Sequence, residues 1–508
     1  MSPQPPGQTT PDGVPEQVRV RREKLARLRA AGVDPYPLGF PRTATVAELR
    51  SRYAELGPDA RTGERVGVAG RVMLSRVGGK LCFATLRDGT GELQVMLSLD
   101  ELGEDSLAAW KADVDLGDHV GVEGEVVTSR RGELSVLADR WAITAKALRP
   151  LPDKHHGLSD PEARVRMRYV DFIVNDEARE VIRDRAAVLK SVRSTLDRNG
   201  YLEVETPQLQ LLHGGAAARP FTTHLNAFDQ PMYLRIAIEL YLKRMVVGGF
   251  ERVYEIGRNF RNEGVDATHS PEFTMLEAYQ AYGDYDTMAD LTRELVLDAA
   301  RALGRTVVPD GHGGQIDLEA PWRHLPVHEA VAEAVGEEVD VTTPVETLRK
   351  LADRHDVAVQ PGWGAGDIVL ELFEKVVEHT LMHPTFVKDY PAEVRPLARP
   401  HRSVPGLAEA WDLIVGGVEL APAYSELSDP VEQRRRLVEQ SLKAAGGDPE
   451  AMQLDEDFLR ALEYGMPPTG GMGLGIDRLV MLLTGKSIRE TIAFPLLKPE
   501  RAGPPGPA

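Results

Sequence analysis

Two segments far apart in the sequence each place an arginine among residues suited to holding a nucleotide. Residues 258–264 read RNFRNEG and are followed by Phe273, and residues 473–478 read GLGIDR. The guanidinium group of Arg261 or Arg478 offers a planar fork of donors that suits a phosphate, and the ring of Phe273 can stack on a purine. The glycines of the second segment leave room for a ligand against the backbone. The two segments together predict a nucleotide site.

The composition limits the class of protein. The chain has 508 residues, of which 42% are hydrophobic, so it is long enough for two or three domains with ordinary cores. No apolar run approaches the roughly 20 residues of a membrane helix. Cys82 is the single cysteine, which excludes an internal disulfide and a zinc site built from several cysteines. We therefore expect a globular cytoplasmic protein without a membrane partner.

The charge argues against broad binding of nucleic acid. The formal net charge is −18, whereas contacts with phosphates need local positive charge. Residues 18–29 read VRVRREKLARLR and form a basic stretch that is expected to be helical and to end near Gly32. Two interpretations stay open: this helix lies along an RNA backbone, or it faces solvent.

Short alternating segments between residues 64 and 148 predict a small β-barrel. Five strands with one inserted helix are the outline of an OB-fold, although periodicity alone does not separate it from another small barrel. The larger part of the chain mixes helices and strands, so the predicted fold class is α+β. The other expected segments are a disordered tail at 1–20, a helical segment at 21–63, a linker at 149–175, a catalytic domain at 176–500 with a mostly helical insertion at about 300–395, and a second tail at 501–508.

Several motifs are similar to those of one enzyme family. The two arginine segments resemble motifs 2 and 3 of the class II aminoacyl-tRNA synthetases, and EVETP at 203–207 resembles motif 1. The segments at 214–221 (GGAAARPF) and 424–427 (YSEL) narrow the resemblance to the bacterial lysyl-tRNA synthetases. The likeness covers nearly the whole chain beyond residue 20. It implies an anticodon-binding OB-fold, a class II catalytic domain built on an antiparallel sheet flanked by helices, and a homodimer that forms through motif 1 near Pro207.

The resemblance implies a lysine–tRNA ligase reaction in two steps. ATP first activates L-lysine to lysyl-adenylate with release of pyrophosphate, and the lysyl group then passes to the 3′ end of tRNA(Lys). The attacking carboxylate is already an anion, so the first step needs alignment and neutralisation of charge rather than a protein nucleophile. Arg261 and Arg478 are the implied catalytic residues, at the α-phosphate and the γ-phosphate. The further implied ATP contacts are Glu263, His269, Phe273 and Gly475.

Mg²⁺ is the implied cofactor, bound with ATP through the carboxylates of Asp412 and Glu419. The two residues are seven apart, so on one strand they would face opposite sides unless a bulge or a bend intervened. The family usually has glutamate at the position of Asp412. The alternative for each residue is an exposed carboxylate on a strand.

Lysine selection needs an anion at the end of an apolar pocket. Glu426 is the implied partner of the ε-ammonium, because a neutral side chain would leave that buried charge unpaired. The other implied lysine contacts are Gly215, Glu239, Glu277, Tyr279 and Tyr424. Pro422 and Ile238 depart from the family pattern, and these departures concern the geometry of the pocket more than the type of reaction.

In the barrel, the resemblance marks Phe83, Gln94 and Glu133 as contacts of the anticodon. An aromatic ring can stack on an unpaired base while polar side chains bond its edge. The alternative for Phe83 is a side chain of the barrel core. Alternatives for the whole protein are an aspartate or asparagine enzyme, or a paralogue with altered or lost charging activity that acts in regulation or lysylates another acceptor.

Overall fold

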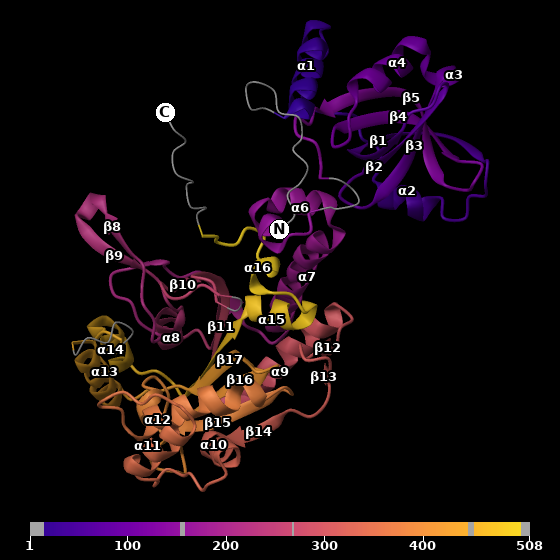
Figure 1. Cartoon of the computed structure of the whole chain (residues 1–508). Coiled ribbons are helices and arrows are strands. Elements are labelled where there is room, and N and C mark those ends of the chain that lie inside the picture. The colour runs from indigo at the N-terminus through magenta and orange to yellow at the C-terminus, as the bar shows by residue number, and fades with distance from the viewer. Residues whose placement is uncertain (1–14, 153–157, 267–268, 446–451, 499–508) are drawn as a thin grey trace, which may run out of the picture. The chain divides into compact units, whose positions relative to one another are not determined.

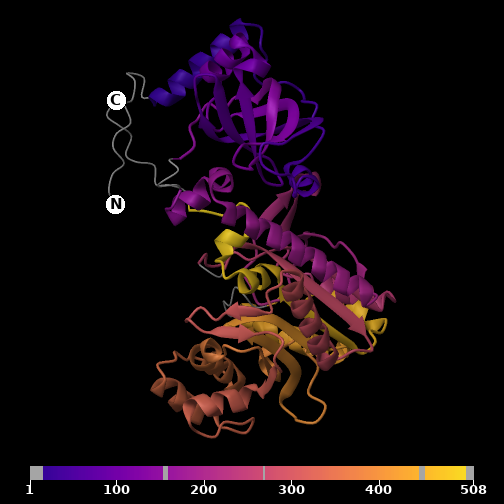
Figure 2. The same cartoon turned by 90° about the vertical axis from the view of Figure 1, so that its right-hand side faces the viewer.

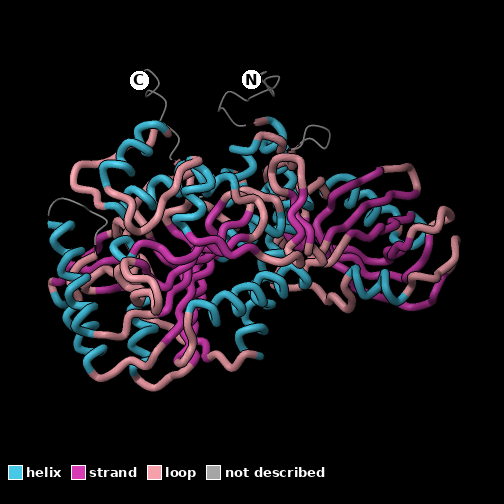
Figure 3. Tube along the Cα trace, turned by 90° about the horizontal axis from the view of Figure 1, so that it is seen from below, coloured by secondary structure: helices cyan, strands magenta, loops and turns pink. Residues whose placement is uncertain are grey.

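A computed structural model describes residues 15–152, 158–266, 269–445 and 452–498. The chain divides into two compact units, Met1–Ser159 and Asp160–Ala508, and each is described by itself (Figure 1). The described strands form a closed barrel, an eight-stranded sheet, a three-stranded sheet and a two-stranded sheet (Figure 3). The expected tail at 501–508 and residues 1–14 of the other expected tail lie outside the described residues.

The N-terminal unit is an OB-fold, as the sequence predicted. Its strands close a barrel in the order β1-β2-β3-β5-β4. The strands β2 and β3 alternate strictly between buried and partly exposed residues, so Cys82, Ala84 and Leu86 point into the core. The elements are α1 (Glu16–Ala30), α2 (Val46–Arg52), β1 (Arg61–Arg76), β2 (Leu81–Arg87), β3 (Glu92–Ser98), α3 (Leu99–Leu102), α4 (Glu104–Asp113), β4 (His119–Thr128) and β5 (Leu134–Ala145).

Helix α1 uses part of its positive charge within the N-terminal unit. Arg21 is buried and donates to the backbone oxygens of Ala147 and Leu116. Lys24 lies 2.7 Å from the carboxylate of Asp115. These contacts attach the helix to the barrel, so neither RNA binding nor exposure to solvent accounts for these two side chains.

The larger unit is built on an eight-stranded sheet with the order β14-β15-β16-β17-β18-β11-β10-β6. Neighbouring strands are antiparallel except at the two ends, where β14 pairs with β15 and β6 pairs with β10 in parallel. The sheet is therefore mixed rather than purely antiparallel. The strands are β6 (Leu202–Glu203), β10 (Arg252–Phe260), β11 (Glu272–Ala281), β14 (Arg323–Pro326), β15 (Thr385–Pro391), β16 (Leu407–Val415), β17 (Val418–Ser425) and β18 (Thr469–Gly475).

Helices α7 (Asp176–Arg198), α9 (Tyr285–Ala302) and α15 (Ile476–Thr484) form the main core with this sheet (Figure 2). Leu276 and Ala278 of β11 and Met472 and Leu474 of β18 are buried in that core. Successive side chains on a strand point to opposite faces. The odd-numbered residues of β11 and β18 therefore lie on the other face of the sheet, where a site can form.

Two expected boundaries differ from the structure. Helices α5 (Pro161–Arg166) and α6 (Arg168–Val174) lie within the expected linker at 149–175. The expected insertion at 300–395 contains helices α10 (Val327–Val335), α11 (Val345–Arg354) and α12 (Ala365–Leu372), but also the sheet strands β14 and β15. Strand β15 is buried at most positions, so it has no alternating pattern that would reveal it. The remaining elements are β7 (Leu209–Gln210), β8 (Thr222–Leu225), β9 (Gln230–Leu234), α8 (Glu239–Val247), β12 (Val307–Pro309), β13 (Gln315–Asp317), α13 (Pro430–Ala445), α14 (Glu456–Glu463) and α16 (Ile488–Thr491), with short 3-10 and π turns between some of them.

Candidate active site

Strand β11 supplies one row of side chains to two adjoining cavities. Phe273 and Met275 line the first cavity, and Met275, Glu277 and Tyr279 line the second. Residues two apart on a strand are about 6.6 Å apart, so the row reaches from one cavity into the other. Met275 lines both cavities and therefore marks the place where they meet.

The first cavity brings together all six residues that were predicted to bind ATP. Arg261 and Arg478 both line it, although more than 200 residues separate them in the sequence. The guanidinium of Arg261 lies 5.2 Å from the centre of the Phe273 ring, and Arg478 donates to the backbone oxygen of Glu419 at 2.6 Å. The six residues are Arg261, Glu263, His269, Phe273, Gly475 and Arg478.

The environment of Arg261 favours an anionic ligand. Burial lowers the pKa of its guanidinium, and the positive charge of Arg478 lowers it further. The acidic neighbours Glu263 and Glu419 act in the opposite direction. Two arginines that share a cavity repel each other, and a polyphosphate placed between them would relieve this repulsion.

A buried ionic network positions the start of α15, the helix that carries Arg478. Asp477 is buried and accepts a hydrogen bond from the backbone nitrogen of Thr274 at 2.6 Å. Arg185 of α7 donates to Asp477 at 2.6 Å and to the hydroxyl of Thr274 at 2.9 Å. The network ties α7, β11 and α15 together. The sequence did not point to Arg185, because nothing local links it to either motif.

The second cavity, of about 290 Å³, brings together all six residues that were predicted to bind lysine. Arg261 lines this cavity as well as the first, so it lies between the two. Gly215 has a φ of +87°, and a side chain there would crowd Ala237 and Glu239. The six residues are Gly215, Glu239, Glu277, Tyr279, Tyr424 and Glu426.

Three buried glutamates make the second cavity acidic. Glu239, Glu277 and Glu426 are 6%, 5% and 2% exposed. Burial raises the pKa of Glu277 to about 7 and that of Glu426 to about 8, and the charge of Glu239 contributes to both shifts. One oxygen of Glu426, Oε2, lies 2.5 Å from the ammonium of Lys243, whereas Oε1 has no hydrogen-bond partner. The three carboxylates share this one buried lysine, so a cationic ligand would add favourable charge.

Ile238 is one of the two departures from the family pattern. Its backbone nitrogen donates to the carboxylate of Glu277 at 2.9 Å. Proline, which is common at this position in the family, has no N–H to donate. Ile238 therefore adds a stabilising hydrogen bond to one wall of the acidic cavity.

The glycines at alternate positions of β18 give the site its depth. Gly471, Gly473 and Gly475 line the cavities, whereas Met472 and Leu474 point into the core. A side chain on Gly471 would overlap the carboxylate of Glu426 and the ring of Tyr279, and one on Gly473 would overlap Met275. The sequence analysis identified Gly473 and Gly475 within motif 3 but missed Gly471.

The expected placement of Asp412 and Glu419 on one strand is corrected by the structure. Asp412 lies on β16 and Glu419 on β17, and a turn with positive φ at Gly416 and Gly417 joins the two strands. A hairpin folds the second strand back beside the first, so the odd spacing does not separate the carboxylates. Both residues line the second cavity, and Glu419 also lines the first.

The acidic groups at this hairpin could supply only some of the oxygen ligands that Mg²⁺ needs. Burial and the nearby charge of Glu419 raise the pKa of Asp412 to about 6 and that of Glu378 to about 7. A divalent cation would relieve this repulsion through oxygen ligands. However, Asp412 also forms an ion pair with Arg395 at 2.5 Å. Within the described ranges, no group of three or more acidic, histidine or cysteine side chains is arranged to hold a metal ion.

The three residues expected to contact the anticodon lie on or beside the outer face of the barrel. Phe83 is partly exposed between the buried Cys82 and Ala84, so it is not a side chain of the core. Phe83 is paired with Met96 of the neighbouring strand β3, on the same face as Gln94. Sequence analysis missed Met96. Gln94 donates to the hydroxyl of Ser135 at 2.9 Å, and Glu133 pairs with Arg50 at 3.2 Å.

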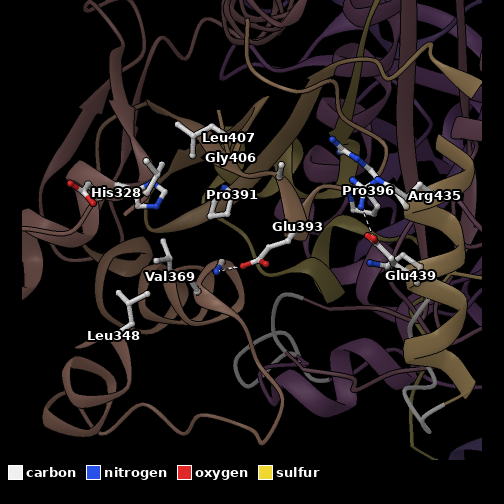
Figure 4. A pocket seen from close by; sticks show the side chains of 17 residues that line it. His328, Leu348, Val369, Pro391, Glu393, Pro396, Gly406, Leu407, Arg435 and Glu439 are labelled. Carbon is white, nitrogen blue, oxygen red and sulfur yellow. Dashed lines mark hydrogen bonds and ion pairs between the residues drawn. The ribbon is translucent and has the colours of Figure 1, made fainter. Parts of the chain in front are cut away.

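A separate cavity of about 480 Å³ lies between the helices of the insertion and α13 (Figure 4). None of the predicted site residues lines it. Glu393 accepts a hydrogen bond from the backbone nitrogen of Gly366, and Arg435 pairs with Glu432 and Glu439. The charged side chains in its walls therefore bind to neighbouring groups of the protein itself.

Comparison with known proteins identifies both units. The family model of class II tRNA synthetases for D, K and N matches residues 160–498, and the model of the OB-fold nucleic acid binding domain matches residues 66–144. A lysine–tRNA ligase of Mycolicibacterium gilvum is 59% identical over 96% of this chain and 98% of its own length. One of Kineococcus radiotolerans is 57% identical with the same coverage of both chains.

A third relative is a longer protein, and the match covers less than half of it. The lysylphosphatidylglycerol biosynthesis bifunctional protein of Mycobacterium ulcerans is 55% identical over 96% of this chain, but the match covers 44% of that protein. In the parts of the chain that the structure describes, no helix has the length and apolar character needed to cross a lipid bilayer.

Proposed function

Because the chain belongs to the class II lysyl-tRNA synthetases, we propose that its two adjoining cavities bind ATP and L-lysine, form lysyl-adenylate, and pass the lysyl group to tRNA(Lys). One observation carries the substrate assignment. Three buried carboxylates, those of Glu239, Glu277 and Glu426, line the second cavity, which we call the amino-acid cavity, and the first is called the nucleotide cavity. One buried lysine, Lys243, pairs with two of them, so negative charge remains in excess and favours a cation, which the ε-ammonium of lysine supplies at Glu426.

Arg261 would perform the central step because it lies between the two cavities. Its fork can hold the lysine carboxylate and the α-phosphate together and stabilise the negative charge that develops between them. Arg478 would hold the outer phosphates from the nucleotide side. Glu263, His269, Phe273 and Gly475 would complete the ATP site around the adenine and the phosphate chain.

The second cavity would recognise lysine through the charged groups at both ends of the substrate. We assign Glu426 and Tyr279 to the ε-ammonium, Glu239 and Gly215 to the α-amine, and Glu277 and Tyr424 to the walls between them. When Mg²⁺ is bound with ATP it supplies positive charge to the phosphates, and Asp412 and Glu419 would be its protein ligands. The ion pair between Arg395 and Asp412 leaves Glu419 as the freer of the two.

The barrel would read the anticodon of tRNA(Lys). The outer position of Phe83 allows its ring to stack on an unpaired base, with Gln94 and Glu133 at the base edge. The presence of Arg261, Glu419 and Arg478 around one cavity argues against a paralogue that has lost the charging reaction. Since tRNA charging serves translation, we place the protein in the cytoplasm.

We also propose that two copies associate through the motif 1 region. Among the described strands, β6, with exposed Leu202, pairs only with β10 at the end of the large sheet, and exposed Leu209, Leu211 and Leu212 follow Pro207. A cluster of exposed apolar side chains next to a strand edge is a typical protein interface. A molar mass of one chain in solution at micromolar concentration, measured by light scattering, would contradict this part of the proposal.

Amino-acid-dependent pyrophosphate exchange across the twenty amino acids tests the function directly. We expect exchange with lysine and background rates with the other nineteen, because an uncharged side chain brings no cation to the carboxylate of Glu426 from the cavity. Exchange with aspartate or asparagine, or with no amino acid, would reject the assignment. Transfer of labelled lysine to tRNA(Lys) then tests the second step.

The affinity for lysine is expected to rise with pH between about 6.5 and 8.5. Glu277 and Glu426 have raised pKa values of about 7 and about 8, so both are largely protonated and uncharged at the lower pH. Ionisation of Glu426 as the pH rises creates the partner of the ε-ammonium, and ionisation of Glu277 adds negative charge to the wall between the two ammonium groups. We expect the lysine KM to fall about tenfold over this range. The KM of ATP, measured in the same reactions, should change much less.

A further inference from the structure

A fully buried lysine lies behind the acidic cavity. Lys243 of α8 is 0% exposed, and its ammonium donates to Glu239 at 2.6 Å, one helical turn earlier. The same ammonium lies 2.5 Å from an oxygen of Glu426, which follows β17. Lysine is almost never fully buried unless it is paired. Here one ammonium joins two carboxylates that come from different elements.

Lys243 belongs to the wall rather than to the cavity. Glu239 and Glu426 line the amino-acid cavity, whereas Lys243 does not. Its two acidic partners raise the pKa of its ammonium in spite of complete burial, so the group stays charged. The ammonium therefore does not occupy the place of a substrate that later displaces it. It is a fixed cation on the far side of the two carboxylates.

The charges of this wall match one class of substrate. Glu239, Glu277 and Glu426 bring three negative charges when ionised, and Lys243 cancels one of them. The two charges that remain equal the two ammonium groups of lysine. Without Lys243, three carboxylates would face two ammonium groups in a buried site, and the excess charge would be costly. The other ionisable side chains that line this cavity are Arg261, Tyr279, Arg395, Asp412, Glu419 and Tyr424, of which Arg395 and Asp412 pair with each other.

We propose that Lys243 is a positioning residue for amino-acid selection, which holds Glu239 and Glu426 in the cavity wall and adjusts the net charge of the wall to a substrate with two ammonium groups. This inference rests on the lysine activation proposed above. It assigns to Lys243 no contact with the substrate. Its effect should therefore appear in the affinity for lysine and in its pH dependence, and not in the binding of ATP.

Lys243→Met tests the proposal because methionine keeps much of the length and removes the charge. We expect the lysine KM in pyrophosphate exchange to rise roughly 10- to 100-fold, while the KM of ATP stays within about twofold. Loss of the neighbouring cation should also raise the pKa values of the carboxyl groups. The decrease of the lysine KM should therefore occur at higher pH than in the wild type. Lys243→Arg retains the charge and should restore this pH dependence, even if its larger size weakens binding.

Lys146→Met is the matched control, because Lys146 is the corresponding buried lysine of the N-terminal unit. Its ammonium is 0% exposed and lies 2.5 and 2.7 Å from Asp115 and Asp118. Loss of this charge should lower thermal stability without changing the lysine KM. The proposal is overturned if Lys243→Met keeps the wild-type lysine KM and pH dependence, or if it alters only stability as Lys146→Met does. Wild-type protein without lysine-dependent exchange would instead reject the proposed function.

Discussion

Glu426→Gln is expected to lower kcat/KM for lysine in pyrophosphate exchange by about a thousandfold. Glutamine keeps the shape of the side chain, so the change isolates the charge. The carboxylate of Glu426 is buried and lines the amino-acid cavity, with Oε2 beside Lys243 and Oε1 without a hydrogen-bond partner. An amide in its place cannot offset the desolvation of the substrate ammonium. The KM of ATP should stay close to that of the wild type, because Glu426 does not line the nucleotide cavity.

Thermal stability gives an independent measure of the same substitution. The raised pKa of Glu426, about 8, indicates that its charge is unfavourable in the ligand-free protein. A raised carboxyl pKa costs stability as the pH rises above the unfolded value of about 4.5. Glu426→Gln removes that cost while Lys243 keeps its ion pair with Glu239, so Tm without lysine should equal or exceed that of the wild type. Lysine should raise Tm of the wild type and leave Tm of the variant unchanged.

Glu409→Gln is the matched control for a buried acid. Glu409 is 1% exposed on β16, does not line the amino-acid cavity, and pairs with Arg402. Its pKa is lowered to about 2, chiefly by Arg402 against the effect of burial, so its charge is satisfied within the protein. The control should lose stability at pH 7 and keep its lysine KM. Similar lysine KM values for wild-type and Glu426→Gln protein would show that another group selects the substrate.

The sequence could predict which residues share the site because several of them lie on the same strand. Phe273, Glu277 and Tyr279 were all named from the sequence, and their even spacing on β11 brings them to one face. The alternation of apolar and polar residues in β2 and β3 likewise predicted the barrel. Motifs carry such information because their residues are neighbours in sequence and in space. The individual contacts of each residue with its ligand remain predictions.

The contacts that sequence analysis missed join distant elements. Lys243 meets Glu426 across 183 positions, and Arg185 meets Asp477 across 292. No local pattern distinguishes these cations from ones that face solvent. The hairpin at Gly416 and Gly417 was missed for another reason, since β16 is buried at every residue and shows no alternation. Burial on both faces hides strand boundaries from a pattern of polarity.

Arg261→Lys is expected to lower kcat for adenylate formation by about a thousandfold, because lysine keeps the charge and loses the planar fork. Arg261 lines both cavities, so its two-sided donors can align the lysine carboxylate with the α-phosphate. A point charge can hold one anion but does not fix the angle between two. Single-turnover measurement of lysyl-adenylate at saturating ATP and lysine separates this step from binding. Arg258→Lys is the control, since Arg258 lies on the neighbouring β10, pairs with Glu272 and lines neither cavity. Equal loss in both variants would point to damage of the sheet, whereas a wild-type rate in Arg261→Lys would show that a different group aligns the two anions.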